Sequence, residues 1–251
     1  MKKIKHYLFP IFTLILVVII WDSVVKIAHI DSWILPSPYR ILIALWDSRQ
    51  LLLRHSFITI FESLSGLVLA VIVAFIVSTA MFFFSTLKKS LYPLLIISQT
   101  IPFIALAPLL VVWFGFGFLP KILIVTLVCF FPIAVNLTDG FQSADPSIIS
   151  SMKILGADRK QLFQFVILPT SLPFFFSGLR ISGSYALLTA VVAEWIGSSS
   201  GLGVLLIRAS KSYLTERVFA TIFVISLISL ISIVIIDKLY NRSKQWNGVN
   251  N

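Results

Sequence analysis

Six long apolar stretches constrain the fold of this chain more than any other feature. They lie at about residues 8–26, 57–84, 91–113, 122–137, 174–196 and 218–239. A helix needs about 20 apolar residues to cross the hydrocarbon core of a bilayer. Such a helix also satisfies its own backbone hydrogen bonds. The pattern therefore predicts an all-α polytopic membrane protein, with six transmembrane helices in a single domain over residues 1–251.

Composition excludes most other classes. The residues AVILMFWYC make up 58% of the 251 residues, and charged residues make up 12%. A soluble domain carries about 25% charged residues, so a soluble domain, a disordered chain and a coiled coil are excluded. The net charge of +10 does not indicate a nucleic-acid partner, because Lys and Arg gather in the cytoplasmic loops of polytopic proteins. The single cysteine, Cys129, excludes an internal disulfide and a thiolate zinc cluster.

The distribution of Lys and Arg predicts the orientation, because cytoplasmic loops carry an excess of both. With both termini inside, the inner segments hold Lys2, Lys3, Lys5, Lys88, Lys89, Lys153, Arg159, Lys160, Lys238, Arg242 and Lys244. The outer segments then hold Arg40, Arg49, Arg54, Lys121, Arg208, Lys211 and Arg217. Eleven basic residues inside against seven outside favour an N-in, C-in topology. In this topology residues 138–169 form the largest inner segment.

This inner segment has the pattern of two short amphipathic helices. Asp145 followed by Pro146 is a typical helix start, because the Asp side chain accepts from first-turn N–H groups and proline suits the first helical position. Apolar residues recur at helical spacing on both sides of Gly156, which permits the positive φ that a tight joint needs. The residues alone leave two interpretations open: a docking knob on the cytoplasmic face, or an interfacial helix pair that holds the bundle together.

The segment from Ser150 to Pro169 resembles the cytoplasmic loop of binding-protein-dependent ABC importer permeases. That family carries Glu-Ala-Ala, three residues, Gly, nine residues, Ile, one residue and Leu-Pro. Here Gly156 and the later Leu-Pro keep the spacing, whereas the Glu-Ala-Ala triplet is replaced by Ser-Ser-Met. The resemblance implies a loop that docks into a groove of a separate cytoplasmic ATPase subunit. Its residues would be Ser150, Ser151, Met152, Gly156, Ala157, Leu168 and Pro169.

Further motifs, in the same order along the chain, resemble the branch of that family that serves nitrate, taurine, alkanesulfonates and thiamine-type pyrimidine precursors. They are Leu-Pro-Ser-Pro at 35–38, Ile-Pro-Phe-Ile-Ala at 101–105, Trp-Phe-Gly-Phe-Gly at 113–117, Gly-Leu-Arg at 178–180 and Gly-Leu-Gly at 201–203. The run from Ala193 to Gly203 most resembles the members that import pyrimidine precursors. Glu62 departs from the pattern, because the branch usually has a basic residue there.

The resemblance implies a permease subunit in a bacterial inner or cytoplasmic membrane. It would import a small organic solute, such as a thiamine-type pyrimidine precursor or a sulfonate, at the cost of ATP hydrolysed by its partner. A permease homodimer would form the path in the lipid bilayer, and an extracytoplasmic binding protein would select the solute. A related pair of permeases is the alternative to the homodimer.

Ionisable and helix-bending residues inside the spans are candidates for the path or its gate. Arg180 and Glu194 lie in the fifth span at positions that share one helix face, about 21 Å apart along the axis. Charged groups in membrane spans are commonly functional. Pro102 and Pro108 remove backbone donors from the third span, which is tolerated where neighbours or cavity water satisfy the freed carbonyls. The alternatives are that Arg180 reaches inner carbonyls or headgroups, and that the prolines only bend the bundle.

Enzymatic chemistry has little support in the sequence. The glycines from Gly197 to Gly203 lack the lysine of a phosphate-binding loop, so we expect no ATPase activity from this chain alone. No spacing of ligands indicates a metal site, and no cofactor is expected. Two other hypotheses were weighed. A secondary carrier or channel often shows internal repeats with broken helices, and no repeat is visible. A membrane-embedded transferase would show clustered Asp, Glu or His at one membrane face.

Overall fold

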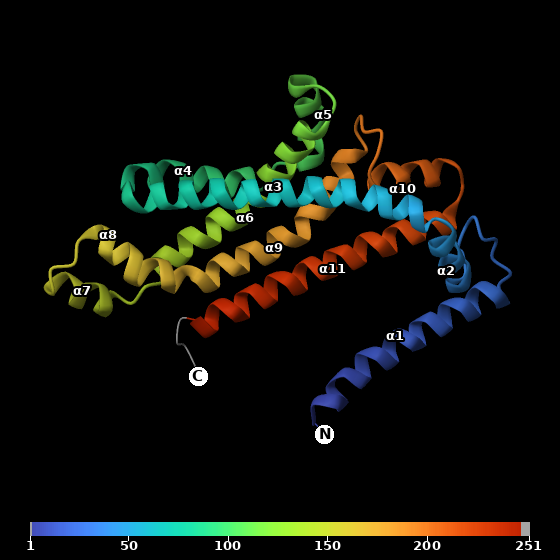
Figure 1. The fold of residues 1–251 in the computed structure, drawn as a ribbon, viewed down its shortest axis with the longest axis horizontal. Helices are drawn as coiled ribbons and strands as arrows, with labels where there is room; N and C mark the ends of the chain where they lie inside the picture. The colour runs from blue at the N-terminus through green and yellow to red at the C-terminus, as the bar shows by residue number, and fades with distance from the viewer. Residues whose placement is uncertain (1, 247–251) are drawn as a thin grey trace.

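The computed structural model describes residues 2–246 of the chain, and side chains from residue 9 to residue 243. Residues 1 and 247–251 of the predicted domain lie outside the described part. Between residues 2 and 246 the chain is built from helices and short connections, without a strand (Figure 1). The helices are α1 (Lys2–Ile27), α2 (Pro38–Asp47), α3 (Arg49–Phe83), α4 (Ser85–Ser98), α5 (Phe103–Phe114), α6 (Phe118–Gln142), α7 (Pro146–Ile154), α8 (Arg159–Leu162), a π-helical turn (Phe163–Ile167), α9 (Leu168–Glu194), α10 (Leu202–Lys211) and α11 (Thr215–Trp246).

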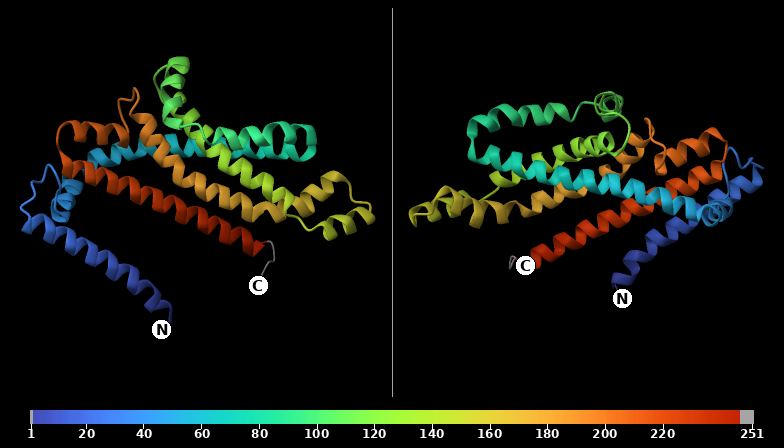
Figure 2. Two further views of the ribbon diagram at one scale, coloured as in Figure 1. Left: turned by 180° about the vertical axis from the view of Figure 1, so that it is seen from behind. Right: turned by 45° about the horizontal axis from the view of Figure 1, so that its top comes forward.

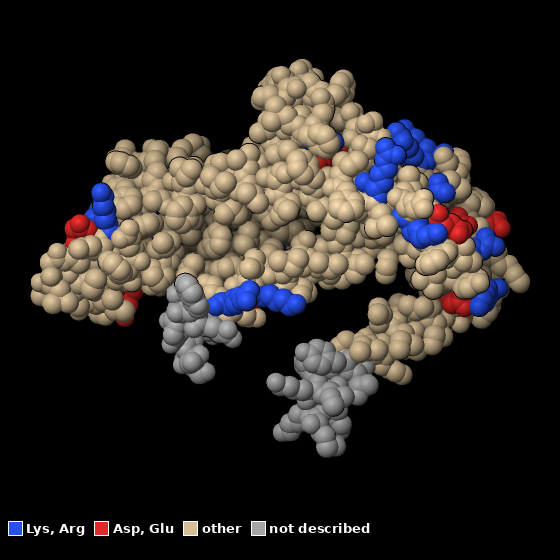
Figure 3. All heavy atoms as spheres, in the orientation of Figure 1, with Lys and Arg blue, Asp and Glu red and all other residues tan. Residues whose placement is uncertain are grey.

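The number of spans agrees with the sequence. Five described helices are long and apolar enough to cross a membrane, and the total is six if α4 and α5 together form one broken span. Charged side chains gather at the two ends of the molecule, near α2 and α10 and near α7 and α8, and the broad surface between them carries few (Figure 3). This distribution is that of a bundle whose middle lies in hydrocarbon.

The third span differs from the continuous helix expected over residues 91–113. Helix α4 ends at Ser98, α5 begins at Phe103, and the two are bent by 104°. Figure 1 shows α5 standing out from the bundle. The physical reason is Pro102, which has no N–H to donate and adopts an extended conformation with ψ of 112°. Hydropathy measures apolarity along the chain and does not detect a change of direction.

The core of the molecule is formed by α3, α6 and α9, which pack against one another along much of their length. Small residues bring these helices close together. Ala70 and Ala74 of α3, Ala134 of α6 and Ala190 of α9 are fully buried. A Cβ added to Gly178 of α9 would lie 2.8 Å from a carbonyl oxygen of α6. Close approach through small residues is the usual packing mode of membrane helices, where no hydrophobic force drives association.

Helices α11 and α1 lie outside this core. Helix α11 packs against α9, α10 and α2. Most of α1 is exposed, and Figure 2 shows it beside the bundle rather than within it. Its later half touches the bundle through Trp21, whose ring centroid lies 5.6 Å from that of Phe219 on α11. The apolar surface of α1 therefore faces lipid or another chain over most of its length.

Candidate functional site

The inner loop begins as the sequence predicts. The carboxylate of Asp145 accepts a hydrogen bond of 2.8 Å from the backbone N–H of Ser147 and so caps α7, whose first residue is Pro146. This hydrogen bond stabilises the charged carboxylate and holds the pKa of Asp145 below its ordinary value. The start of α7 is thereby fixed by local chemistry alone.

The predicted joint at Gly156 is confirmed. Gly156 has φ of +86°, and no atom lies within 4 Å of a Cβ added there. The glycine is therefore required by the backbone conformation and not by packing. Beyond it, Asp158 begins α8 with a capping box, in which its carboxylate accepts from the Gln161 N–H at 2.7 Å and the Gln161 side chain accepts from the Asp158 N–H at 2.8 Å.

The second helix of the loop is not the separate short element that the pattern suggested. Helix α8 continues through the π-helical turn into α9, so Leu168 and Pro169 lie in the first turn of a long spanning helix. The π-helical turn accommodates Pro169, which has no N–H to donate to a carbonyl of the preceding turn. In this wider turn the backbone N–H of Leu168 bonds to the carbonyl of Phe163, five residues earlier, so the chain stays helical past the proline.

An aromatic cluster fixes the base of the loop to the bundle. The ring of Phe163 lies 5.0–5.3 Å from the rings of Phe82, Phe83 and Phe141, measured between centroids. The Arg159 guanidinium donates a 2.8 Å hydrogen bond to the carbonyl of Phe82 and lies over the rings of Phe82 and Phe83. This aromatic cluster therefore links the loop to the ends of α3 and α6.

The tip of the loop carries an exposed apolar pair. Ile154 is 86% exposed and Leu155 is 82% exposed, at the end of α7 just before the glycine joint. The hydroxyls of Ser150 and Ser151 donate to carbonyls one turn earlier in α7, at 2.8 and 2.9 Å. Of the other residues expected in the docking loop, Gly156 and Pro169 are exposed, and Met152, Ala157 and Leu168 are half-buried. An apolar knob on a polar loop is typical of a protein interaction site.

A buried polar network lies at the opposite end of the bundle. Glu62 of α3 is 0% exposed and pairs through Oε1 with the ammonium of Lys121 at the start of α6. Lys121 also donates to the hydroxyl of Ser198 at 3.1 Å. Among the described residues, Oε2 of Glu62 has no hydrogen-bond partner. A buried charge is tolerated in a membrane protein when it is paired, so each of the two charges depends on the other.

Glu194 joins this network from the end of α9. Its Oε1 accepts a 2.6 Å hydrogen bond from the hydroxyl of Thr59 on α3, and its Oε2 accepts one of 2.6 Å from the N–H of Gly203. Thr59 in turn accepts from the N–H of Leu202 at 2.9 Å. The carboxylate thus caps the start of α10, where free N–H groups and the helix dipole favour negative charge.

The glycines of this region leave room for the carboxylate. Gly201 has φ of +121°, and a Cβ there would collide with the carboxyl group of Glu194. A Cβ on Gly203 would collide with the carbonyl of Val191. The N–H of Gly201 lies 2.9 Å from Nδ1 of His55, which accepts from it in the tautomer that leaves this nitrogen unprotonated. Helix α10 is therefore held to α3 and α9 by side chains that the glycines allow to approach.

The other candidate residues for the path do not belong to this network. Arg180 forms an ion pair of 3.1 Å with Asp237 of α11, and its side chain is 60% exposed, so it does not join Glu194. Pro102 lies at the break before α5, and Pro108 is exposed on α5. Helix α5 packs through its opposite side, at Ala107, against α6 and the end of α9.

Sequence reasoning singled out Glu194 but missed the pair that accompanies it. In the sequence, Lys121 reads as one of the outer basic residues, and Glu62 reads only as a departure from the family pattern. The sequence did contain a signal for this pair, because an acidic and a basic residue within apolar segments each need a buried partner. Glu62 and Lys121 are far apart in sequence, so their pairing could not be recognised from the sequence alone.

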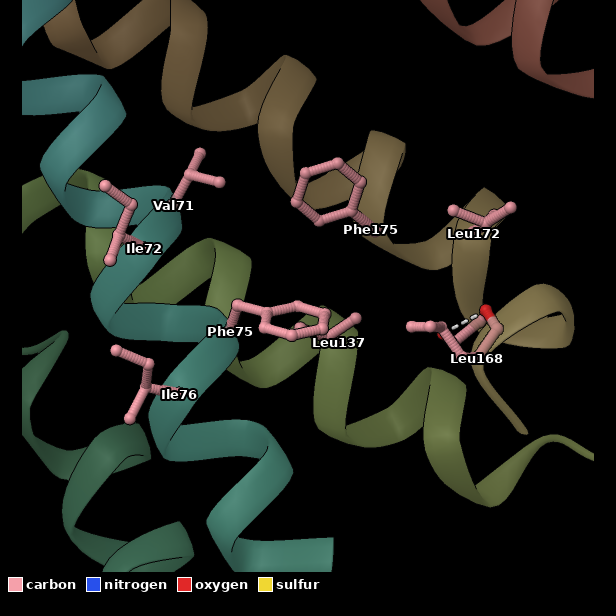
Figure 4. A pocket seen from close by; sticks show the side chains of 9 residues that line it. Val71, Ile72, Phe75, Ile76, Leu137, Leu168, Leu172 and Phe175 are labelled. Atoms are coloured by element: carbon pink, nitrogen blue, oxygen red, sulfur yellow. Dashed lines mark hydrogen bonds between the residues drawn. The ribbon is translucent and has the colours of Figure 1, made fainter. Parts of the chain in front are cut away.

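An apolar cavity between the core helices has no side chain that could orient a polar solute. It has a volume of about 340 Å³ and lies between α3, α6 and α9 (Figure 4). Figure 4 shows its labelled side chains, Phe75 and Phe175 among them, as hydrocarbon. The only polar side chain in its wall, Ser171, already donates to the carbonyl of Leu168 at 2.8 Å. Such a groove suits lipid or another apolar helix rather than a polar solute.

Comparisons with known proteins give the chain its family. Residues 66–245 match the model of the binding-protein-dependent transport system inner membrane component. A formylaminopyrimidine transport permease of Halalkalibacterium halodurans is 35% identical over 98% of both chains. A riboflavin transport permease of Chloroflexus aurantiacus is 34% identical, over 94% of this chain and 89% of that protein. A taurine transport permease of Escherichia coli is 31% identical, over 94% and 88%.

Solved structures agree on the fold. The MetNI methionine ABC transporter in an inward-facing conformation aligns with a TM-score of 0.70 at 17% identity, over 78% of this chain and 98% of that one. An amino acid ABC transporter solved with histidines aligns with a TM-score of 0.64 at 15% identity, over 81% and 97%. This chain belongs to the family of inner-membrane permease components of binding-protein-dependent ABC importers.

Proposed function

We propose that this chain imports a small organic solute of the class of thiamine-type pyrimidine precursors, while a separate cytoplasmic subunit hydrolyses ATP. The observation that carries the proposal is the inner loop, in which a glycine joint at positive φ presents Ile154 and Leu155 to solvent. The formylaminopyrimidine permease named above, similar over nearly its whole length, supports the solute class. A sulfonate is the second candidate, supported by the taurine permease.

The loop is the element through which the ATPase subunit acts. Its docking residues are those of the family pattern, Ser150, Ser151, Met152, Gly156, Ala157, Leu168 and Pro169. The exposed pair at Ile154 and Leu155 supplies the apolar surface of contact. Because α8 continues into α9, and Phe163 packs on the ends of α3 and α6, a displacement of the loop moves three spans together.

The outer end serves as the gate. Glu194 holds α10 against α3, and the Glu62–Lys121 pair holds α3 against α6. Rearrangement of α10 would then open or close the outer side of the path, with Pro102 and Pro108 shaping the broken span and Arg180 acting near the inner side. Two copies of the chain enclose the path, and a solute-binding protein delivers the solute from outside.

The experiment is a retention assay. The tagged chain is co-expressed with its partner ATPase from the same organism, and the ATPase retained after purification is quantified. We expect the double change Ile154→Asp with Leu155→Asp to reduce retention at least tenfold, because charged groups replace the apolar contact. Leu42→Asp is the matched control, since Leu42 is equally apolar and 62% exposed on α2, at the other end of the bundle. Full retention by the double variant would reject the docking role of the loop.

A further inference from the structure

A second cavity lies where the third span is broken. It has a volume of about 300 Å³, at the lower end of the range for small-molecule sites. Its wall joins the α4–α5 break to the middle of α6 and to α9. The residues that line it include Gln99, Phe103, Val128, Phe131, Pro132 and Tyr185.

The backbone around this cavity is irregular in two places. Residues 99–102 lie between α4 and α5, so their N–H and C=O groups are outside any regular helix. On the facing wall, Pro132 has no N–H to donate to the carbonyl of Val128, four residues earlier. Non-helical backbone within a membrane is tolerated only where protein buries it or where it lines a water-filled cavity. Transporter folds commonly place solute sites at such broken helices.

The side chains of the cavity define a chemical class. The rings of Phe103, Phe131 and Tyr185 supply flat apolar surface, and the Gln99 amide and the Tyr185 hydroxyl supply donors and acceptors. None of the residues that line the cavity is charged. The nearby cations are engaged elsewhere, Lys121 with Glu62 and Arg180 with Asp237.

We propose that this cavity is a solute subsite of the transport path and that it selects a neutral, planar heteroaromatic solute over a sulfonate anion. The inference rests on the proposed import function and narrows its solute class. A flat ring fits between aromatic side chains, and an amide such as Gln99 pairs with the adjacent donor and acceptor edges of an aminopyrimidine. A sulfonate would find no cation in the wall of the cavity to offset the hydration that it loses on entry, which is unfavourable. The apolar cavity of Figure 4 also has aromatic side chains, Phe75 and Phe175, but it has no amide to pair with a polar ring edge.

The test uses the full complex of permease, ATPase and binding protein in proteoliposomes, with formylaminopyrimidine and ethanesulfonate, a simple monoanion, as probes. In the wild type we expect ATP-dependent uptake of formylaminopyrimidine and no competition by excess ethanesulfonate. Gln99→Leu and Tyr185→Phe should each raise the uptake KM for formylaminopyrimidine about 3- to 10-fold, the effect of one lost hydrogen bond. Tyr240→Phe makes the same chemical change on α11, away from the cavity, and should leave the KM unchanged. The ATPase retained by each variant verifies that it is folded.

The outcomes separate the two proposals. An unchanged KM in both Gln99→Leu and Tyr185→Phe overturns the subsite. ATP-dependent uptake of ethanesulfonate without uptake of formylaminopyrimidine overturns the solute class and leaves the import function standing. Absence of ATP-dependent uptake for both probes, together with uptake driven by an ion gradient, overturns the proposed ATP-driven import itself.

Discussion

Replacing Lys121 by methionine should destabilise the protein severely, because it leaves the Glu62 carboxylate buried without its counter-ion. Glu62 is 0% exposed, its Oε1 pairs with Lys121, and its Oε2 has no partner among the described residues. Breaking a buried ion pair by removing one member costs about 3–5 kcal/mol. Each 1.4 kcal/mol is tenfold in an equilibrium constant, so the unfolding equilibrium constant should rise about 10²- to 4 × 10³-fold.

The double variant Glu62→Gln with Lys121→Met distinguishes a lost ion pair from a damaged core. With both charges removed, no uncompensated charge remains, and most of the stability should return, to within about 1–2 kcal/mol of the wild type. Arg180→Met is the matched control. It removes a cation from an ion pair whose side chains are 60% and 40% exposed, where a pair contributes about 0–1 kcal/mol.

The assay is equilibrium unfolding of the purified chain in mixed micelles, followed by tryptophan fluorescence. The three variants and the wild type are compared at the same detergent composition. Wild-type stability for Lys121→Met would refute the reasoning, because Glu62 would then need no counter-ion. A double variant less stable than the single one would refute it as well, since the loss would come from packing and not from charge.

Three further predictions concern the glycines and the topology. Gly156→Val should cost about 1–3 kcal/mol locally and reduce uptake and ATPase retention, while membrane insertion stays normal. Gly156→Asn should retain most uptake, because asparagine tolerates positive φ. Normal uptake together with normal ATPase retention in the valine variant would reject the docking knob. Gly201→Ala should lower the unfolding temperature more than Gly115→Ala does. Both glycines have positive φ, but only at Gly201 would the added Cβ collide with a carboxyl group. Equal shifts of the unfolding temperature in the two variants would contradict the described packing of α10. A cysteine at Ser150, with Cys129 replaced, should resist an impermeant thiol reagent in intact cells, and rapid labelling would invert the topology.

The features that depend on local chemistry were predictable from the sequence. The spans follow from runs of apolar residues, the start of α7 from Asp145 and Pro146, and the joint from Gly156. Each of these is determined by residues within a few positions of one another. Glu194 was also identifiable, because a lone carboxylate in an apolar segment is uncommon.

The features that depend on three-dimensional packing were not predictable from the sequence. Glu62 and Lys121 are 59 residues apart, and their pairing depends on the rotation of α3 against α6. The break before Phe103 was signalled by Pro102, but the direction in which the chain continues was not, so the 104° bend could not be predicted from local residues. Phe82 and Phe83 lie at the end of an apolar run, where aromatic residues commonly mark the membrane interface. Their contact with Phe163 required the folded loop.

The most direct test of the central claim is solute uptake by proteoliposomes that contain the permease, its ATPase and its binding protein. We expect uptake of radiolabelled formylaminopyrimidine to require all three proteins, and ATP on the side of the membrane where the loop lies. We also expect the permease alone to hydrolyse no ATP. Uptake by the permease alone, driven by a proton or sodium gradient and independent of ATP, would contradict this function and favour a secondary carrier.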